Sequence, residues 1–362
     1  MSMRFTLDLS HHPWTRDKSH SAPRRMLATA HAADAAGIDA IWASEDPEGW
    51  DAFAILSAIA AVTQSAALGT SVTSPYPRHP NMLAASVATL DRLSGGRAVL
   101  GLGRGQPEWH GKALGVEIGD PLAALRETID LLRAWERPPH RASSPPDGHF
   151  AVRNWERATH PTQERVPILL AAAGPKATAL AAEVCDGVIF NLMTSPRVLR
   201  DVVPRVRSAA AATGRNSDAL WFVLRSTATI VASPETERAA LDRGKHHLAL
   251  VATLPGMHRL YDVDGFDVPA LLAEIRAVMR TEGTLAAGGG FPALRRAGDL
   301  PAARAMIPDD LIRDLGIIGT LPEVQARLRT LGQLGVTHVG LAPPPEPTSP
   351  EAWRSLLTAL RA

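Results

Sequence analysis

Residues 166–191 read VPILLAAAGPKATALAAEVCDGVIFN, two apolar runs on either side of an alanine-rich segment. The runs at 166–172 and 186–191 are short and apolar, which predicts two buried strands. The segment at 174–185 begins with Gly-Pro, as many helices do, and continues with strong helix formers. A helix that joins two buried strands indicates a parallel sheet covered on both faces.

The same alternation of strand and helix continues along the whole chain. Eight strand-like segments are expected, at 4–9, 38–44, 66–74, 97–103, 166–172, 186–191, 220–232 and 336–342. Eight parallel strands close a (β/α)8 TIM barrel, for which about 250 residues suffice. We therefore predict an α/β fold with one TIM-barrel domain over 1–362, and an open doubly wound sheet is the alternative.

The remaining residues fall in two excursions from the barrel pattern. One follows strand 4 at 137–149 and is rich in proline and serine, which is typical of a surface segment. The other lies between strands 7 and 8, at 255–310, and we expect it to be irregular with a helix only around 269–281. Because extra segments of such barrels often lie at the strand ends, this insertion is expected to cover the active-site mouth.

Composition excludes several classes of partner. The net charge is +1, so no nucleic-acid or anionic-membrane partner is indicated. No apolar run reaches about 18 residues, which favours a cytoplasmic protein. The single Cys185 allows no internal disulfide and is interpreted as a buried structural thiol. The adjacent His11 and His12 lack a third ligand at fixed spacing, so no metal site is predicted.

Polar groups follow several of the predicted strands, and the carboxyl ends of barrel strands meet at one rim. Asp8 lies inside the apolar strand at 4–9, so it must face a site, a partner or water. Glu45 and Asp46 follow the second strand as adjacent carboxylates, which could transfer protons or serve as acidic neighbours of a helix start.

Two further segments at this rim could bind a ligand. GLGRGQPEW (101–109) departs from the dinucleotide fingerprint because Gln106 takes the place of its last glycine and Pro107 follows, but its glycines allow close approach to the backbone. AAAGPKATAL (171–180) places Lys176 in the first turn of a helix, which favours an anion. Its proline also fits an ordinary helix start without any ligand.

Together these strand ends resemble the luciferase-like monooxygenase (bacterial luciferase) family, and most closely its branch that uses the deazaflavin coenzyme F420. That branch includes methylenetetrahydromethanopterin reductases and F420-dependent glucose-6-phosphate dehydrogenases. The most specific blocks are LGTSVTSPYPRHPNMLAASVATLDRLSGGRAVLGLGRG (68–105) and VPILLAAAGPKATALAAEVCDGVIFN (166–191). The resemblance implies a TIM barrel with the cofactor at its carboxyl rim and a non-proline cis peptide at Ser71–Val72, in a bulge that backs the ring.

The resemblance also implies roles for individual residues of the rim. The residues implied to bind the cofactor are Glu45, Ser71, Val72, Ser74, Arg104, Gly105, Gly174, Pro175, Lys176 and Ala177. The candidate catalytic residues are Asp46, Asp8 and His11, in that order as proton donors, and Gln106. Asp46 and Gln106 stand where the sugar-phosphate dehydrogenase has a catalytic histidine and glutamate, so its substrate and its acid–base scheme are not expected.

The resemblance therefore predicts an F420-dependent oxidoreductase that passes a hydride between the deazaflavin C5 and a small organic substrate, an activated alkene or imine. The alternative is an FMN-dependent monooxygenase that receives reduced flavin from a separate reductase. A non-catalytic homologue that keeps the fold is the third possibility. Family members are commonly homodimers, so the same assembly is expected.

Overall fold

The computed structural model describes residues 3–10, 17–172 and 174–362 of the chain, with the side chains of Pro107 and Glu108 left aside. Eight parallel strands follow one another around a barrel, and the last of them pairs with the first. They are β1 (Arg4–Asp8), β2 (Ala40–Ala43), β3 (Ala67–Thr70), β4 (Ala98–Leu102), β7 (Ile168–Ala171), β8 (Gly187–Phe190), β9 (Trp221–Ile230) and β11 (His338–Leu341). The predicted TIM barrel is confirmed, and the open sheet is excluded because the ring of strands closes.

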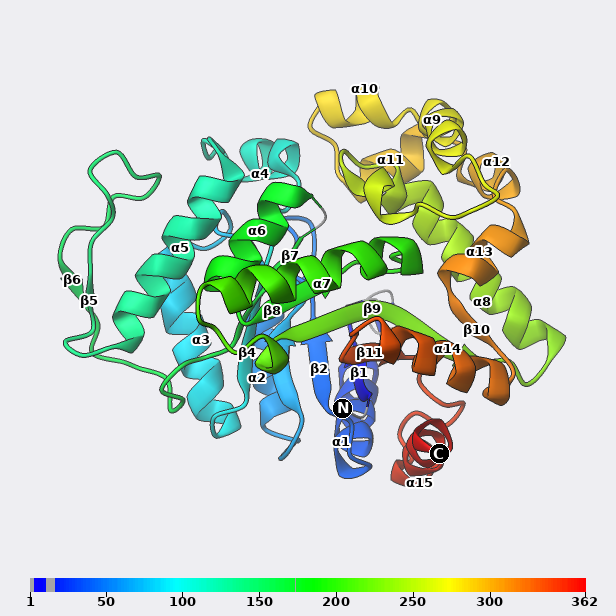
Figure 1. Cartoon of the computed structure of the whole chain (residues 1–362), viewed down its shortest axis with the longest axis horizontal. Helices are drawn as coiled ribbons and strands as arrows, with labels where there is room; N and C mark the ends of the chain where they lie inside the picture. The colour runs from blue at the N-terminus through cyan, green and yellow to red at the C-terminus, as the bar shows by residue number, and fades with distance from the viewer. Residues whose placement is uncertain (1–2, 11–16, 173) are drawn as a thin grey trace.

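Helices surround the barrel, as Figure 1 shows. They are α1 (Ala22–Ala35), α2 (Ala52–Ala60), α3 (Pro80–Ser94), α5 (Pro121–Glu136), α6 (Pro175–Val184), α7 (Pro196–Ala212), α8 (Pro234–His247), α14 (Leu321–Gln333) and α15 (Pro350–Arg361). Most begin with proline in the first turn, where its missing N–H costs nothing. Several have a Ser or Asp at the N-cap; Ser195, for example, accepts from the backbone N–H of Val198.

Two apolar layers hold the barrel together. The larger layer lies between the strands and the surrounding helices and includes Phe5, Leu56 and Leu170. The smaller layer fills the barrel interior and is dominated by Trp42, which is fully buried. Its ring leaves no room on the next strand, because a Cβ at Gly69 would lie 2.3 Å from Trp42 Cζ3. Glycine at position 69 is therefore required by packing.

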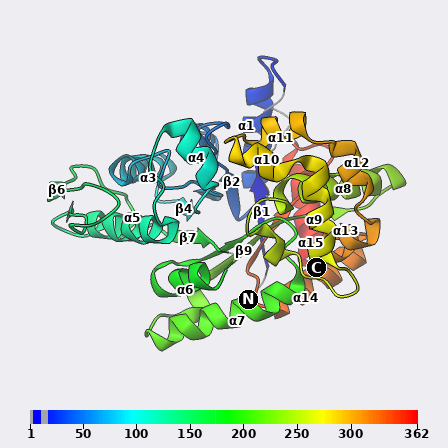
Figure 2. The same cartoon turned by 90° about the horizontal axis from the view of Figure 1, so that it is seen from above.

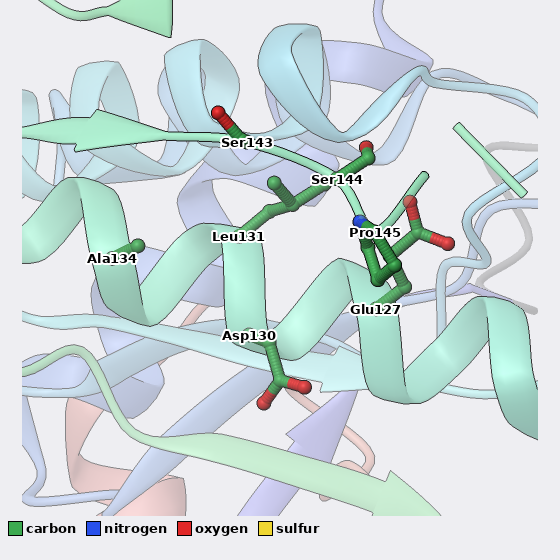
Figure 3. A pocket seen from close by; sticks show the side chains of 7 residues that line it. All are labelled: Glu127, Asp130, Leu131, Ala134, Ser143, Ser144 and Pro145. Atoms are coloured by element: carbon green, nitrogen blue, oxygen red, sulfur yellow. The ribbon is translucent and has the colours of Figure 1, made fainter. Parts of the chain in front are cut away.

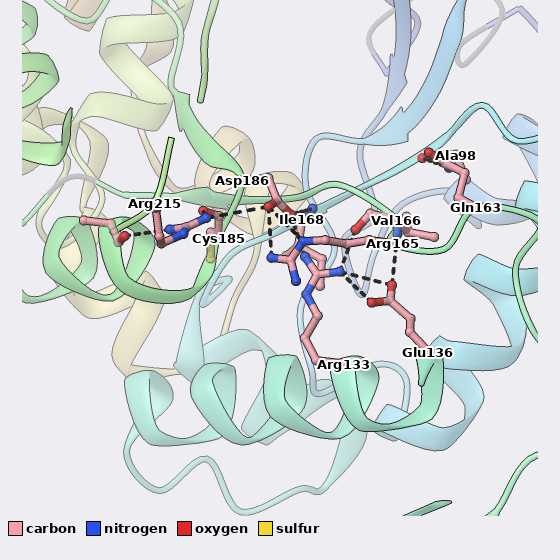
Figure 4. A network of polar contacts seen from close by, with 11 residues as sticks. Ala98, Arg133, Glu136, Gln163, Arg165, Val166, Ile168, Cys185, Asp186 and Arg215 are labelled. Carbon is pink, nitrogen blue, oxygen red and sulfur yellow. Dashed lines mark hydrogen bonds and ion pairs between the residues drawn. The ribbon is translucent and has the colours of Figure 1, made fainter. Parts of the chain in front are cut away.

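A network of ion pairs and backbone hydrogen bonds closes the amino end of β7 and β8 (Figure 4). Asp186, just before β8, binds Arg133 of α5 at 2.5 Å and Arg165 at 3.0 Å, and it accepts the Ile168 N–H at 2.9 Å. The neighbouring Cys185 is fully buried, and burial raises the pKa of its thiol to about 12. These contacts agree with the structural role predicted for this cysteine.

The first excursion contains a small antiparallel hairpin outside the barrel. Its strands are β5 (Arg141–Ala142) and β6 (Trp155–Glu156), at the left of Figure 1. Two helices lie between β4 and this hairpin, first α4 (Pro107–Leu114) and then α5. The excursion therefore lies where the sequence predicted it, between strands 4 and 5 of the barrel.

The second excursion is almost entirely helical, so the prediction of an irregular segment was wrong. Within the predicted 255–310 lie the 3-10 helix Met257–Leu260, α9 (Val268–Met279), α10 (Thr281–Ala286), α11 (Phe291–Ala297) and α12 (Leu300–Ala305). The π-helix Leu248–Ala252 precedes this range, and α13 (Asp309–Leu315) and β10 (Ile317–Gly319) extend beyond it. These helices build their own apolar core around Leu272, Met279 and Ile312. Only α9 is long enough to show a clear helical period, which is why it alone was predicted.

Among the described residues, no helix combines the length and apolar character needed to cross a membrane.

Candidate functional site

The segment after β3 is bonded to both neighbouring strands. The peptide between Ser71 and Val72 is cis, at the position that the family resemblance implied. On one side the Ser71 N–H donates to Ala43 O at 2.8 Å, and Val72 O accepts the Glu45 N–H at 3.0 Å. On the other side Thr73 exchanges two backbone hydrogen bonds with β4 and Gly103. Residues 71–73 are thus held in place at the carboxyl rim of the barrel.

Glu45 fastens this segment from the second strand. Its Oε2 accepts from Thr73 Oγ1 at 2.5 Å, and its Oε1 accepts from Arg78 Nη2 at 2.8 Å. Arg78 also pairs with Asp51 at 2.8 Å. Burial opposes the charge of Arg78, but the hydrogen bonds to Glu45 and Asp51 outweigh it and raise the pKa of the guanidinium. In this geometry Glu45 supports the segment that would face a ring.

Ser74 meets a histidine that the sequence did not single out. Ser74 Oγ lies 3.2 Å from His110 Nε2, and His110 is 2% exposed. Burial lowers the pKa of His110 to about 4, so the imidazole is neutral near pH 7. Gly105 has φ +62° and a Cβ there would lie 2.0 Å from His110 Nε2, so the site requires glycine on both counts.

Asp8, the last residue of β1, forms an ion pair with Arg225. Arg225 of β9 donates to Asp8 Oδ2 through Nη2 at 2.6 Å and Nε at 3.1 Å. The Ser10 N–H donates to Oδ1 at 2.9 Å. The carboxylate of Asp8 is thereby held between a cation and a backbone N–H, which makes it a structural partner of Arg225 at this rim.

The other candidate catalytic residues lie around the mouth. Asp46 is exposed on the loop after β2. Gln106 is the N-cap residue of α4, and its Oε1 is buried without a partner among the described residues. His11 lies outside the residues that the structure describes. Glu48, which the sequence analysis did not select, is exposed, but its carboxyl group is partly desolvated. This desolvation and the nearby Asp46 outweigh the hydrogen bond from the Phe291 N–H and the charge of Arg295, so the pKa of Glu48 is raised.

The predicted phosphate turn lies at the start of α6. Gly174 is the N-cap residue, Pro175 and Lys176 are exposed, and Thr178 closes the turn with a hydrogen bond to Pro175 O at 2.9 Å. The insertion brings a second cation to this turn, since Arg259 Nη1 is 3.4 Å from the position of a Cβ on Gly174. Such a helix start, with two cations beside it, suits a phosphate.

The insertion approaches the rim at several points. Arg104 Nη2 donates to Pro255 O at 2.8 Å, and Lys112 of α4 donates to Ala287 O. The rings of Trp109 and Phe291 meet edge to face with centroids 4.8 Å apart. Figure 2, seen from above, shows α10 and α11 beside α4.

The pocket drawn in Figure 3 lies away from this rim, in the groove between α5 and the first excursion. Its volume is about 360 Å³, and Glu127, Asp130 and Ser144 are among its lining residues. The Glu127 carboxylate already accepts the N–H groups of His149 and Phe150 at 2.7 and 3.1 Å. This pocket contains none of the predicted site residues.

The structure therefore brings together the residues after β1, β2, β3 and β4 and adds four that the sequence analysis missed, namely Thr73, Arg78, His110 and Arg225. Arg225 had the same signal as Asp8, a charged residue within an apolar strand, and could have been found. His110 carried no such signal, because its burial depends on Gly105 and Tyr76. Among the described residues, no group of three or more His, Cys, Asp or Glu could hold a metal ion.

Comparison with known proteins adds evidence from whole sequences. The family model described as luciferase-like monooxygenase matches residues 3–338. A Mycobacterium tuberculosis protein provisionally named a coenzyme F420-dependent oxidoreductase is 32% identical over 330 residues, which cover 87% of this chain and 89% of that protein. The 5,10-methylenetetrahydromethanopterin reductase of Methanolobus tindarius is 29% identical over 330 residues, with 90% and 93% covered.

A similar fold occurs in a solved structure. The coenzyme F420-dependent tetrahydromethanopterin reductase of Methanopyrus kandleri superposes with a TM-score of 0.73. The match covers 98% of this chain and 97% of the other at 21% identity. At that identity the likeness concerns the fold.

Proposed function

The chain belongs to the luciferase-like monooxygenase family, and from this premise we propose that it is an F420-dependent oxidoreductase that transfers a hydride to or from a small organic substrate. The relative at 32% identity over most of both chains is named for the same cofactor, and so is the Methanopyrus kandleri reductase with this fold. The proposal adds roles for the residues of the rim.

One observation at the site carries the choice of a ring-bearing cofactor. Ser71 Oγ, Gln106 Oε1 and His110 Nδ1 are buried polar atoms without a partner among the described residues, and all three follow β3 or β4. A buried polar atom without a partner is costly, so such atoms in a group indicate a ligand that completes them. A deazaflavin carries C=O and N–H groups along one edge and a phosphate on its side chain, and the rim offers complements for both.

The residues of this chain would divide the work between binding and orientation. Ser71, Val72 and Ser74 would support one face and edge of the ring, and Arg104 and Gly105 would line it from the next strand. The turn at 174–177 would hold the phosphate through backbone N–H groups and Lys176. When bound, F420 supplies the hydride at C5 of the deazaflavin, and the protein supplies position and protons.

We propose that Asp46, on the loop after β2, transfers the proton, because its exposed carboxyl group can exchange protons with the substrate and with solvent. Asp8 is engaged in its ion pair with Arg225, and Gln106 cannot release and recover a proton as a carboxyl group does. His11 stays a candidate from its place in the sequence after the first strand. Since hydride acceptors that need a proton include activated alkenes and imines, these are the proposed substrate classes.

The insertion is proposed to cover the mouth of the site as a lid. The support is its contact with three segments of the rim, at Arg104, at Glu48 and at Lys112. A lid there would exclude water from the hydride step. A cytoplasmic location and a homodimer remain proposals from the resemblance and the composition.

Titration of the purified protein with oxidised F420 and, separately, with FMN tests the cofactor. Tryptophan fluorescence reports binding because Trp109 and Trp42 lie at or below the rim. We expect F420 to bind with micromolar affinity and FMN to bind far more weakly. Binding of FMN alone would contradict the proposal and indicate an oxygenase that works with a flavin reductase, and binding of neither ring by a folded sample would favour a non-catalytic homologue.

A further inference from the structure

An irregularity in the pairing of two barrel strands sets the direction of the Arg225 side chain. In the pairing of β9 with β11, Leu224 lies opposite Val339 but Thr227 lies opposite Gly340, so Arg225 and Ser226 bulge out of the register. Gly340 makes room for this bulge, because a Cβ there would lie 3.0 Å from the carbonyl oxygens of both extra residues. Bulges of this kind redirect side chains at barrel rims.

The Arg225 guanidinium contacts residues of two other strands, Asp8 of β1 and Ser44 just after β2. It donates to Asp8 Oδ2 at 2.6 and 3.1 Å, and its Nη2 also donates to Ser44 Oγ at 3.2 Å. The Arg225 side chain is 13% exposed and that of Asp8 is 20% exposed. An ion pair so little exposed is screened weakly, and loss of one partner leaves the other charge uncompensated.

The contacts continue from Ser44 to the segment that follows β3. Ser44 Oγ donates to Ser71 O at 2.6 Å and accepts from Ser10 Oγ at 3.0 Å. Ser10 in turn contacts Asp8, since the Ser10 N–H donates to Asp8 Oδ1 at 2.9 Å. Four barrel strands are thereby connected through side chains, from β9 to β1, β2 and the residues after β3.

We propose that Arg225 is a positioning residue that acts through Asp8 and Ser44 to fix the Ser71 carbonyl and, with it, the backbone on which the cofactor ring would rest. The inference rests on the proposed function for the identity of the ring, F420. It assigns Arg225 a role that neither the strand pattern nor the family resemblance gave it. A connected set of this kind loses its effect as a unit when one member is removed.

A double-mutant cycle tests the proposal with Arg225→Met, Asp8→Asn and the double variant. F420 is the probe, or FMN if the unmodified protein binds only that ring. We expect each single variant to bind the ring about tenfold more weakly, and the double variant to be little worse than either, because both act through one network. Arg225→Lys should recover part of the affinity, and so should added guanidinium ion with a variant in which Arg225 is replaced by alanine.

Arg97→Met is the matched control, since Arg97 is also half-buried and bonds Ala66 O at 2.6 Å and Thr63 O at 2.9 Å, at the start of β3. It should lower stability without changing ring affinity. Unchanged affinity in Arg225→Met, additive losses in the double variant, or an equal loss in Arg97→Met would each overturn the proposal.

Hydrogen exchange in the protein without any ring separates this inference from the cofactor assignment. Arg225→Met should raise amide exchange at 40–46 and 70–76 several-fold, because the Ser44 N–H donates to Ser10 Oγ within the network. Arg97→Met should leave 70–76 unchanged. If neither F420 nor FMN binds, amide exchange still tests whether Arg225 positions this segment. Unchanged exchange at 70–76 in Arg225→Met would refute the positioning role.

Discussion

At the scale of single residues, His110 shows how burial sets a charge state within the site. It contacts Ser74 Oγ, and its ring lies tilted beside that of Tyr76 with centroids 5.3 Å apart. Burial lowers the pKa of His110 to about 4. An unfolded histidine has a pKa of about 6.5, so between these values the unfolded chain binds the extra proton. The free energy of unfolding therefore falls as the pH drops from 6.5 towards 4.

Replacing His110 by glutamine removes this dependence. We expect the decline in the free energy of unfolding between pH 6.5 and 4 to be smaller by about 2 kcal/mol, after an allowance for screening. Urea unfolding at several pH values measures it. Identical slopes in the variant and the unmodified protein would show that His110 is not neutral in the fold. His338, whose pKa burial lowers to about 3, contributes to the same window and should leave a residual slope.

Ser74 is the residue whose hydroxyl is most directly assigned to the cofactor. Ser74→Ala is expected to weaken F420 binding about fivefold to tenfold, the usual loss for one neutral hydrogen bond. It should also lower the free energy of unfolding by about 1 kcal/mol, because the buried His110 Nε2 loses its contact with the Ser74 hydroxyl. Ser94→Ala is the control, because the buried Ser94 hydroxyl bonds Asp91 O at the carboxyl end of α3, before the start of β4 and away from the rim. Equal affinities of Ser74→Ala and the unmodified protein for F420 would remove Ser74 from the binding site.

At the scale of elements, the barrel strands were predictable and the short helices were not. All eight strands were found because each is a buried apolar run bounded by a helix start or a glycine. The helices from α10 to α13 have six or seven residues each, too few for a helical period, and glycine or proline separates them. The rim contacts of Arg225 and His110 likewise depend on pairing across distant strands, which no local pattern reveals.

Packing between elements predicts the effect of filling position 69 in β3. Gly69→Ala would place a Cβ 2.3 Å from Trp42 Cζ3 and 2.8 Å from Val99 O. We expect a loss of about 2 kcal/mol or more in the free energy of unfolding, because the barrel interior cannot expand. Gly283→Ala is the contrast, since nothing lies within 4 Å of a Cβ there and it is in α10. Urea unfolding should show that variant unchanged or more stable, and equal stability of the two variants would contradict this description of the core.

At the scale of the whole molecule, we propose that the insertion and the barrel form one site. The apolar core of the insertion includes Trp109 of α4, and the Phe291 ring packs against it edge to face. An edge-to-face aromatic pair contributes about 1 kcal/mol beyond its buried area. Phe291→Ala is therefore expected to raise the dissociation rate of F420 about fivefold in stopped-flow fluorescence. Phe266→Ala, which removes another ring packed against the same apolar core, should leave that rate unchanged, and an equal rise in both would argue against a lid.

The location of the cofactor is the claim on which these roles depend, and a crystal structure of the protein with F420 tests it most directly. We predict the deazaflavin ring against residues 71–74, its polar edge within hydrogen-bond reach of Ser71, Gln106 or His110, and its phosphate at the turn 174–177. A ring bound in the groove beside Glu127, or at the amino end of the barrel near Asp186, would contradict the assignment of this rim as the active site.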